Sequence, residues 1–366
     1  QLGTAFDGRT TAVSWGSRKV LAAAGVWDSM AKQSCAIDTI HILDGYSPVL
    51  LTFDREEVGG RSFGWIMENR FMRQVLLQHV RARKSAVHIA PAAVSDFIHD
   101  DDFVMVKLED GRAFSAKLVV GADGRNSFTR EKMGVGARQW AYNQRALAFV
   151  VTHEKPHGNI AVEHFRSSGP FAILPMPDAP DGSHRSSVVW TEHGADRNSA
   201  RHFDEDVFNA ALAARFPDRY GTVKRAGKVF SFPLGLVHAH DYIAPRMALV
   251  ADAAHGIHPI AGQGLNLGFR DIAALAELVG DADDPGDPTL LKQYQRARRL
   301  DNMAMAGATD MLTRLFSNDI APLGIARRIG LRAVARSRMA KLFFMKQAMG
   351  ASGLLPAMIR DGEEAA

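Results

Sequence analysis

The chain has 366 residues, of which 46% are hydrophobic and 23% are charged, and it carries a net charge of +4. This composition is typical of a globular protein with a sizeable buried core, and it excludes a disordered, collagen-like or disulfide-stapled chain. A single cysteine, Cys35, rules out an intramolecular disulfide and favours a reducing compartment.

In chain order, the first part alternates helices with short strands. Residues 1–4 lack the basic and apolar stretches of a targeting signal. Apolar residues on one face of 14–24, followed by Gly25, predict a helix with a glycine just past its end. The further elements predicted here are strands at 40–43 and 49–53 around a turn at Asp44-Gly45, a helix at 68–83, a strand at 87–89, a hairpin turning at Asp110-Gly111, and a strand at 117–120.

The second part begins with a long strand-rich segment. Residues 145–232 carry strand patterns punctuated by proline and glycine, which predict a separate antiparallel sheet. Residues 247–250 are a short buried strand that leads through a glycine-rich loop to an amphipathic helix over about 263–279. After a linker at 281–288 the pattern is helical to the end. The longest apolar runs stay far below the roughly 20 residues that cross a bilayer.

The C-terminal helical stretch is strongly basic. Between residues 327 and 346 there is no acidic residue, and this asymmetry favours an anionic surface as a partner. The basic residues are Arg327, Arg328, Arg332, Arg336, Arg338, Lys341 and Lys346.

Two strand-to-loop junctions carry residues suited to ligand binding. In the first, the apolar strand 118–120 runs into Gly121, Asp123 and Gly124. Glycines let a ligand approach the backbone, and a carboxylate at the carboxyl end of a strand can accept hydrogen bonds from a sugar or order the loop. Taken alone, a tight turn in which Asp123 caps the next helix is the simpler explanation.

The second junction delivers Asp252 from the strand at 247–250. A proline-containing loop follows, and Gly262, Gln263 and Gly264 open a helix whose free backbone N–H groups face that loop. Such groups suit an anionic or electron-rich ring edge. A capped helix after a glycine loop is the alternative, although three glycines in seven residues are more than a cap requires.

The same segment raises two other kinds of site. Asp252, His255 and His258 suggest a metal, because residues three apart are neighbours on a helix. Gly256 and Pro259 favour an irregular loop instead, and no cysteine or further acid joins the three residues, so no metal is expected. A serine hydrolase is not expected either, since the chain has no Gly-x-Ser-x-Gly motif.

Together the two junctions resemble the paired signatures of the class A flavoprotein monooxygenases, which have the para-hydroxybenzoate hydroxylase fold. The first is VVGADGRNSFTR, and the second, about 120 residues later, is LVADAAHGIHPIAGQGLNLGFRDIAALAEL. The form HPIAGQGLNLG is similar to the ubiquinone-biosynthesis hydroxylase branch. Further matches are DGRTTAVSWGSRKVLAAAGVW, ENRFMRQVLL, GPFAILPMP and RLFSNDIAPLGIARRIGL, so the resemblance covers nearly the whole chain.

The resemblance implies a FAD site, with NAD(P)H as co-substrate, and assigns roles to individual residues. Asp252 would bind the flavin ribityl or ribose hydroxyls, Pro259 would line the flavin ring, and the backbone of 262–266 would meet the pyrimidine edge. Asp123 and Gly124 would support the FAD pyrophosphate and the visiting nicotinamide cofactor. The full set of matching residues is Arg9, Asn69, Asp123, Gly124, Asp252, Pro259, Gly262, Gln263, Gly264, Leu265 and Asn266.

Near the N-terminus the resemblance is incomplete. Arg9 and Asn69 match positions that contact the FAD phosphates and the ribityl chain. Ala251, however, stands where the family usually has glycine, and no Gly-x-Gly-x-x-Gly precedes Arg9. The acidic residue expected about 20 residues after that motif is missing as well. These elements are expected to lie upstream of Gln1, in a longer natural chain.

The activity implied by the resemblance is hydroxylation of the aromatic ring of a polyprenylated phenol in ubiquinone biosynthesis. It would use NAD(P)H and O2 through a flavin C4a-hydroperoxide, and it would need no catalytic side chain. The alternatives are a same-fold flavin enzyme with other chemistry, such as a halogenase or isoprenoid reductase, and a non-catalytic scaffold of the biosynthetic complex.

The partners implied are the lipid substrate, O2, other ubiquinone-biosynthesis proteins and an anionic membrane, but no nucleic acid. The basic C-terminal stretch would make a peripheral membrane contact from the cytoplasmic side, or form a wall for the prenyl tail. An ordinary packing helix with a solvated basic face explains the same pattern equally well.

The predicted fold is α/β with an α+β substrate domain. A Rossmann-like FAD-binding domain is expected over 1–36, 66–140 and 240–282. An antiparallel-sheet substrate domain is expected over 37–65 and 141–239, and a C-terminal helical region over 289–366.

Overall fold

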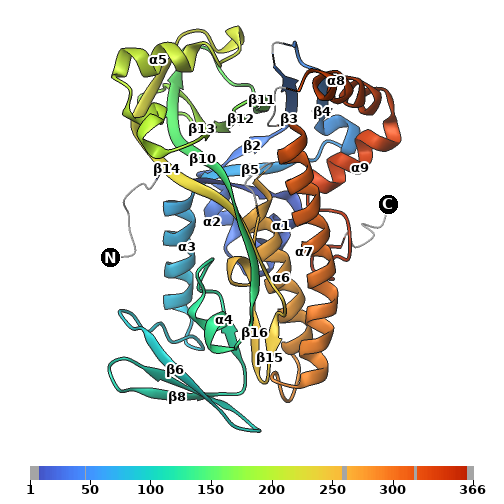
Figure 1. The fold of residues 1–366 in the computed structure, drawn as a ribbon. Coiled ribbons are helices and arrows are strands. Elements are labelled where there is room, and N and C mark those ends of the chain that lie inside the picture. Colours follow the sequence, from blue (N-terminus) through green and yellow to red (C-terminus); the bar gives the residue numbers. More distant parts are fainter. Residues whose placement is uncertain (1–7, 46, 258–261, 317–319, 361–366) are drawn as a thin grey trace.

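The computed structural model describes residues 8–45, 47–257, 262–316 and 320–360 (Figure 1). The strands are β1 (Thr10–Ser14), β2 (Cys35–Ile37), β3 (Thr39–Asp44), β4 (Leu51–Asp54), β5 (Gly64–Glu68), β6 (Val94–His99), β7 (Val104–Leu108), β8 (Ala113–Ala116), β9 (Val119–Gly121), β10 (Ala137–His153), β11 (Ile160–Arg166), β12 (Gly169–Met176), β13 (His184–His193), β14 (Val223–Ala239), β15 (Ile243–Ala244), β16 (Met247–Leu249) and β17 (His255–Gly256). The helices are α1 (Trp15–Ala23), α2 (Trp27–Ala31), α3 (Asn69–Ala82), α4 (Phe128–Lys132), α5 (Glu205–Ala213), α6 (Gln263–Val279), α7 (Pro288–Phe316), α8 (Ala321–Arg336) and α9 (Arg338–Ala348).

The largest sheet has eight strands in the order β17-β14-β10-β13-β12-β11-β3-β4. Its neighbouring strands are antiparallel except β11 and β3, which run parallel. One face carries the aromatic and aliphatic core around Phe149, Phe171 and Trp190, and α5 covers it with Phe208. The predicted antiparallel sheet over 145–232 is confirmed, and the 37–65 segment adds β3 and β4 to its edge.

A second, smaller sheet links distant parts of the chain. Its strands β9 and β16 run parallel, with Gly121 opposite Leu249, and β15 pairs with β16. Short continuous apolar runs predict β9 and β16, and β16 is buried against α6 and α7. In Figure 1 the long strands β10 and β14 run through the middle of the molecule and lead from the eight-stranded sheet down to this small one.

The C-terminal helices pack on the side of β3 and β4, at the upper right of Figure 1. α8 and α9 cover Leu51 and Phe53 of β4 with Leu331 and Met345. This burial holds the two amphipathic helices against the sheet. None of the helices within the described ranges is both long and apolar enough to cross a bilayer.

The structure corrects two predicted elements. Residues 87–89 are not a strand, and Val87 is 83% exposed, because three alternating residues without a buried face do not hold a strand in place. The helical pattern also ends at Ala348. Gly350 and Gly353 have positive φ, and the turns beyond them bury Ile359. The division into domains remains a prediction.

Candidate active site

The two junctions meet at one edge of the small sheet. Because β9 and β16 are parallel, the loops that follow them leave on the same side. The Val250 N–H donates to the Gly121 carbonyl oxygen at 3.0 Å and extends the pairing by one residue. Asp123 and Asp252 therefore follow neighbouring strand ends, although about 130 residues separate them along the chain.

Asp123 is engaged within its own loop. Its carboxylate accepts a hydrogen bond from the Ser127 hydroxyl at 2.5 Å and from the Thr129 N–H at 2.8 Å, at the start of α4. Burial alone would raise the pKa of Asp123, but these hydrogen bonds bring it below its ordinary value. Asp123 therefore caps the next helix, which was the simpler of its two predicted roles. Gly124 beside it has a φ of +85° and open space around its Cα.

Arg130 joins the two junctions, and the sequence analysis did not single it out. It is buried in the middle of α4, where its Nη1 donates to the Ala253 carbonyl at 2.9 Å and its Nη2 to the Arg125 carbonyl at 3.0 Å. A guanidinium with two fixed backbone acceptors holds both loops in register. Its position as the last residue of the first signature was the signal that could have found it.

Asp252 has a different environment from Asp123. Its side chain is exposed, and within the described ranges no hydrogen bond or ion pair reaches its carboxylate. Ala251 before it adopts a φ of +53°, the left-handed region that glycine occupies at no steric cost. The Ala251 methyl group fits because the facing residue is Gly268, where a Cβ would lie only 2.7 Å away.

The first turn of α6 has uncapped N–H groups. Gly262 lies at the N-cap position with a φ of +62°, and no side chain caps the helix. Gly264 has no closer neighbour than Ile257 at 3.9 Å from a Cβ built there, and Leu265 is exposed. A helix N-terminus that no described side chain caps is a suitable site for an anionic or electron-rich group.

Asn266 and Gln263 fix this helix start to the rest of the protein. The buried Asn266 side chain accepts from the Ser14 N–H at 2.9 Å and donates to the Ala12 carbonyl at 3.0 Å. Gln263 is buried too, and its amide donates to the Ala348 carbonyl at 3.4 Å. Asn266 can therefore face a ligand through its backbone only.

Arg9 and Asn69 lie side by side where β1 pairs with β5. The Asn69 N–H donates to the Arg9 carbonyl at 3.1 Å, and the Asn69 side chain accepts from the Thr11 hydroxyl at 2.5 Å. The Arg9 guanidinium lies 5.6 Å from the centre of the Phe232 ring. Pro259 and His258 lie outside the described residues.

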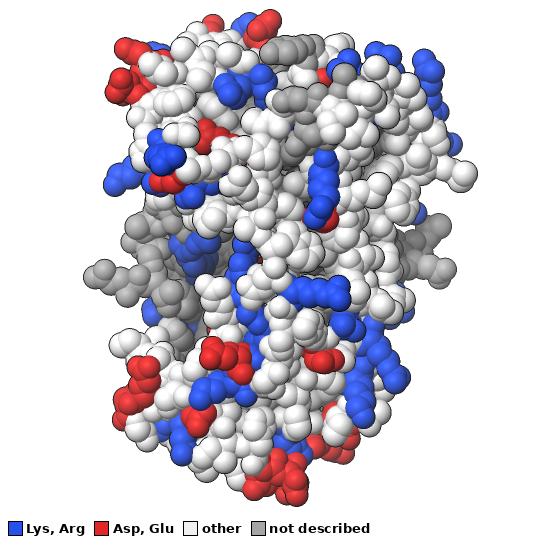
Figure 2. Space-filling view, in the orientation of Figure 1, with Lys and Arg blue, Asp and Glu red and all other residues white. Residues whose placement is uncertain are grey.

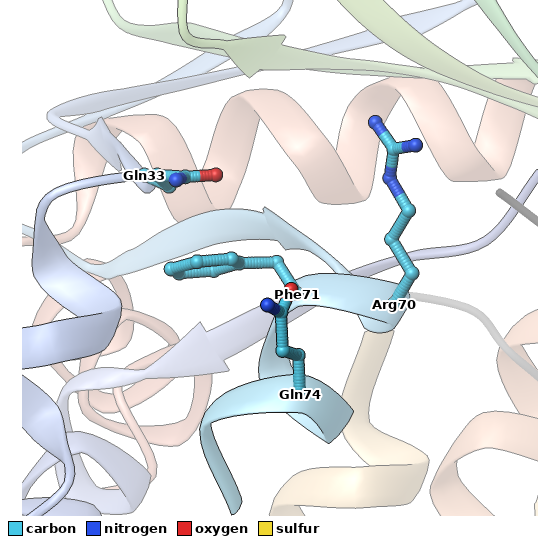
Figure 3. Close-up of a pocket in the computed structure, with 4 residues that line it drawn as sticks. All are labelled: Gln33, Arg70, Phe71 and Gln74. Atoms are coloured by element: carbon cyan, nitrogen blue, oxygen red, sulfur yellow. The ribbon is translucent and has the colours of Figure 1, made fainter. Parts of the chain in front are cut away.

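A cavity of about 220 Å³ opens next to Asn69. Gln33 from the segment after α2 and three side chains of α3 line it, and Figure 3 shows Gln33 above the Phe71 ring with the Arg70 guanidinium extending to one side. The fourth lining residue is Gln74. The sequence analysis named none of these residues, since each belongs to an ordinary amphipathic pattern.

A buried charged cluster supports the second junction. Asp271 of α6 is 0% exposed, and its Oδ2 accepts from the Ala251 N–H at 3.0 Å and from the buried His255 ring at 2.5 Å. Its Oδ1 accepts from Arg298 at 2.9 Å and from Asn302 at 3.0 Å, both on α7. Asp271 thus joins the junction, α6 and α7 through four hydrogen bonds.

The electrostatics of this cluster stabilise the ionised carboxylate. Burial alone would raise the pKa of Asp271, but His255 and Arg298 hold it below its ordinary value. The His255 nitrogen that faces Asp271 is committed to this contact. Among the residues that the structure describes, no group of three His, Cys, Asp or Glu side chains could hold a metal ion.

The arrangement fits a flavin nucleotide. The exposed Asp252 carboxylate is suited to accept hydrogen bonds from sugar or ribityl hydroxyls. The uncapped start of α6, the helix whose Gly268 contacts Ala251, is suited to the polar edge of the ring. These features fit a flavin-binding protein better than a hydrolase.

A family model described as an FAD binding domain matches residues 3–309, and the chain belongs to this family. It is an FAD-dependent enzyme of the monooxygenase class, and the resemblance to class A flavoprotein monooxygenases is confirmed.

Individual proteins of this family and of this fold are similar to the chain over most of its length. The chain is 44% identical over 359 residues to the ubiquinone hydroxylase UbiL of Rhodospirillum rubrum, covering 97% of this chain and 82% of that protein. It is 33% identical over 359 residues to the 3-demethoxyubiquinol 3-hydroxylase of Escherichia coli, covering 94% and 88%. The solved structure of p-nitrophenol 4-monooxygenase PnpA from Pseudomonas putida DLL-E4 matches the fold with a TM-score of 0.77 at 17% identity, covering 96% and 90%.

Proposed function

We propose that this protein hydroxylates the aromatic ring of a polyprenylated phenol in ubiquinone biosynthesis, with NAD(P)H as reductant and O2 as oxidant. The observation that carries the proposal is the exposed Asp252 beside the uncapped start of α6, in a chain 44% identical to a ubiquinone hydroxylase. Bound FAD supplies the activation of O2. The chain's own residues bind and orient the cofactor and the substrate and keep water out.

The residue roles that the resemblance implies are proposed for this chain, and the surroundings of the described side chains support them. Asp252 binds the ribityl or ribose hydroxyls, and the N–H groups of 262–266 bind the pyrimidine edge of the flavin. Arg9 and Asn69 lie together at the start of β1 and α3 and contact the phosphates and the ribityl chain. Pro259, outside the described residues, is proposed to line the ring.

Asp123 and Gly124 act by shaping the loop. The Asp123 carboxylate already accepts hydrogen bonds from Ser127 and Thr129. We therefore propose that it orders the loop beneath the pyrophosphate and the visiting nicotinamide cofactor. A scaffold that has lost FAD is the less favoured alternative, because the exposed Asp252 has no described partner and no described side chain caps α6, as expected of residues kept for a ligand.

The cofactor test uses purified protein titrated with FAD. We expect Asp252→Ala to weaken FAD binding on the order of tenfold or more, because a charge-assisted hydrogen bond is lost. Asp281→Ala, an exposed aspartate in the linker, is the matched control and should bind FAD like the wild type. Equal FAD affinity in Asp252→Ala and the wild type would contradict the assigned role.

The reaction test supplies NAD(P)H, isotopically labelled O2 and a short-chain prenylated phenol. The expected product is the phenol with one labelled hydroxyl on its ring. Oxidation of NAD(P)H with no labelled ring product from any prenylated phenol would contradict the proposed function.

We also propose that α8 and α9 contact an anionic membrane from the cytoplasmic face. Ile329 is 61% exposed and Met339 84%, and Figure 2 shows basic side chains among uncharged ones over these helices. Part of the basic run is already used, because Arg327 lies 3.3 Å from Asp44 and Lys341 2.6 Å from Glu57. Arg328 is exposed but also lies 3.4 Å from Asp44. The other exposed basic residues of the run are Arg332, Arg336, Arg338 and Lys346.

The membrane test is vesicle co-sedimentation. Binding should rise with anionic lipid content and fall with salt, at about 1 kcal/mol per basic residue near the surface. Replacing Arg332 and Arg336 with glutamate should abolish binding. The same change at the exposed Arg197, in the connection between β13 and α5, should not. Equal binding to neutral and anionic vesicles would contradict the proposal.

A further inference from the structure

One row of side chains crosses the large sheet on the face opposite the α5 core. Strand pairing places its members on adjacent strands at the same level. From β14 to β3 they are Phe230, Ala148, Val189, Ala172, Glu163 and Ile42. Since side chains alternate between the faces of a strand, this row shares its face with Ser187, two positions from Val189.

This face is the one turned toward the candidate flavin site. Gly8 lies directly on the Phe230 ring, where a Cβ would come within 2.0 Å of a ring carbon. Thr10 at the start of β1 donates its hydroxyl to Ser187 at 2.7 Å. The segment that carries Arg9 therefore rests on the same face as the row.

The middle of the row is bordered by apolar side chains and has small residues at its base. Ala148 and Ala172 project only a methyl group each. On one side, the residues next to the row belong to the hydrophobic core that lies beneath α9 and beneath the loop before β5. On the other side Phe165 of β11 packs against Phe316 of α7, with ring centres 4.0 Å apart. Ala148 is 7% and Ala172 9% exposed, so the two alanines are recessed beside the partly exposed Val189 and Glu163. A flat apolar ring is the kind of group that can lie against such a recessed strip.

Glu163 is the polar exception in this row. It is paired with Ala172 on one side and Ile42 on the other, and its side chain is only partly exposed. Across the described parts of the chain, no hydrogen bond or ion pair to its carboxylate is found. A carboxyl group left without a donor among apolar neighbours costs stability, so its presence points to a ligand that supplies the donor.

The charged groups around Glu163 do not neutralise it. Burial raises the pKa of Glu163 to about 7, and no neighbouring charge contributes. Asp44 of β3, on the same face, is ion-paired with Arg327 and Arg328 of α8.

On α7, which packs against β12, Asp310 and Arg314 are likewise ion-paired with each other. Asp310 accepts from Arg314 at 2.9 Å and from the Tyr142 hydroxyl at 2.9 Å. Burial alone accounts for the raised pKa of Glu163, and no charged side chain of the covering helices contributes to it.

We propose that Glu163 accepts a hydrogen bond from the ring hydroxyl of the phenol substrate and so orients the ring over Ala148 and Ala172. This assignment rests on the proposed function, because it needs a phenol as the substrate. It makes Glu163 a specificity-determining residue: the site recognises the O–H group rather than the prenyl tail alone.

The test compares two ligands on the FAD-loaded protein. A short-chain prenylated phenol and its methyl ether differ only in the hydroxyl hydrogen, and their dissociation constants are measured by calorimetry. The wild type should prefer the phenol on the order of tenfold, since the ether offers no donor. In Glu163→Gln this preference should fall severalfold, while Glu205→Gln, on the α5 side of the sheet, should keep it.

A pH series gives a readout that a structural role would not change. Phenol binding to the wild type should strengthen as pH rises through about 7, because the ionised carboxylate is purely an acceptor. Binding of the ether, and binding of the phenol to Glu163→Gln, should lack this step. The wild-type series stands on its own even if the variant folds poorly.

The outcomes separate the two proposals. If the wild type binds FAD but hydroxylates no prenylated phenol, the proposed function fails. If it hydroxylates the phenol, yet binds phenol and ether equally well with no step near pH 7, the Glu163 assignment fails and the function stands.

Discussion

Two buried or partly buried carboxylates, Asp271 and Glu163, have opposite surroundings. Asp271 beneath the second junction accepts four hydrogen bonds from the backbone, His255, Arg298 and Asn302. Glu163 in the sheet row accepts none from the described residues. The pKa of Asp271 is lowered by His255 and Arg298 despite burial, whereas burial raises that of Glu163 to about 7.

The difference teaches how this protein divides support from recognition. A carboxylate whose acceptors are all filled fixes the elements around it and cannot engage a ligand. A carboxylate without donors destabilises the empty protein and is free to bind a substrate group. Regions of the first kind are expected to control stability, and those of the second kind binding.

The largest effect is expected when Asp271, whose carboxylate accepts four hydrogen bonds, is removed. Asp271→Ala should lower the free energy of unfolding by about 3 to 5 kcal/mol, because the buried His255 would lose its acceptor and the buried Arg298 would keep only Asp301 as a carboxylate partner. Asp271→Asn keeps the shape and should lose less. Urea unfolding at pH 7 measures both, and a loss below about 1 kcal/mol in Asp271→Ala would break the comparison.

Removing the carboxylate of Glu163 should have the opposite effect on stability. The pKa of Glu163 is raised in the folded protein to about 7, above its unfolded value of about 4.3. The folded state thus binds the proton more tightly, and stability falls as pH rises from about 4.5 to 7.

Glu163→Gln removes that ionisation and should stabilise the protein by about 1 to 3 kcal/mol at pH 8. At pH 4.5 it should leave stability nearly unchanged. Urea unfolding at the two pH values measures the difference, and a variant less stable than the wild type at pH 8 would show that Glu163 has a structural partner.

A third test concerns the fit of Ala251 against α6, next to the Asp271 cluster. Gly268→Ala should cost about 1 to 3 kcal/mol, since its methyl group would meet that of Ala251. Adding Ala251→Gly removes the second methyl group and relieves the left-handed strain, so the double variant should regain most of the loss. Strictly additive effects in thermal unfolding would contradict this coupling.

The smallest effect on stability is expected at Asp252, an exposed carboxylate with no described partner. Asp252→Ala should change the free energy of unfolding of the FAD-free protein by less than about 0.5 kcal/mol. In saturating FAD the variant should gain less thermal stability than the wild type, because weaker binding stabilises less. A large loss without FAD would place Asp252 with Asp271 as a supporting residue.

Sequence reasoning located the junctions because their signals are local. A strand that ends in glycines and a carboxylate is visible in ten residues, and so is a glycine-opened helix. The helix starting at Ser14 was likewise readable, and its Ser14 side chain accepts from the Ser17 N–H. The roles assigned to these residues stay predictions.

The supporting cluster was not readable in the same way. His255, Asp271 and Arg298 are spread over more than 40 residues, and each alone is compatible with a solvated helix or loop. Glu163 could be placed on a strand by alternation, but which elements cover its face depends on tertiary packing. The lack of any partner is a property of the fold, so only the structure could reveal it.

The bonds between Asn266 and β1 set an order in which the protein can be assembled during synthesis. Ser14 and Asn266 are 252 residues apart, so the candidate cofactor site stays open at one side until residue 266 has left the ribosome. At about 5 to 20 residues per second that interval is roughly 13 to 50 seconds. Once β5 has been made, β1 can pair with it, but the face of β1 that meets α6 stays uncovered until the end of this interval.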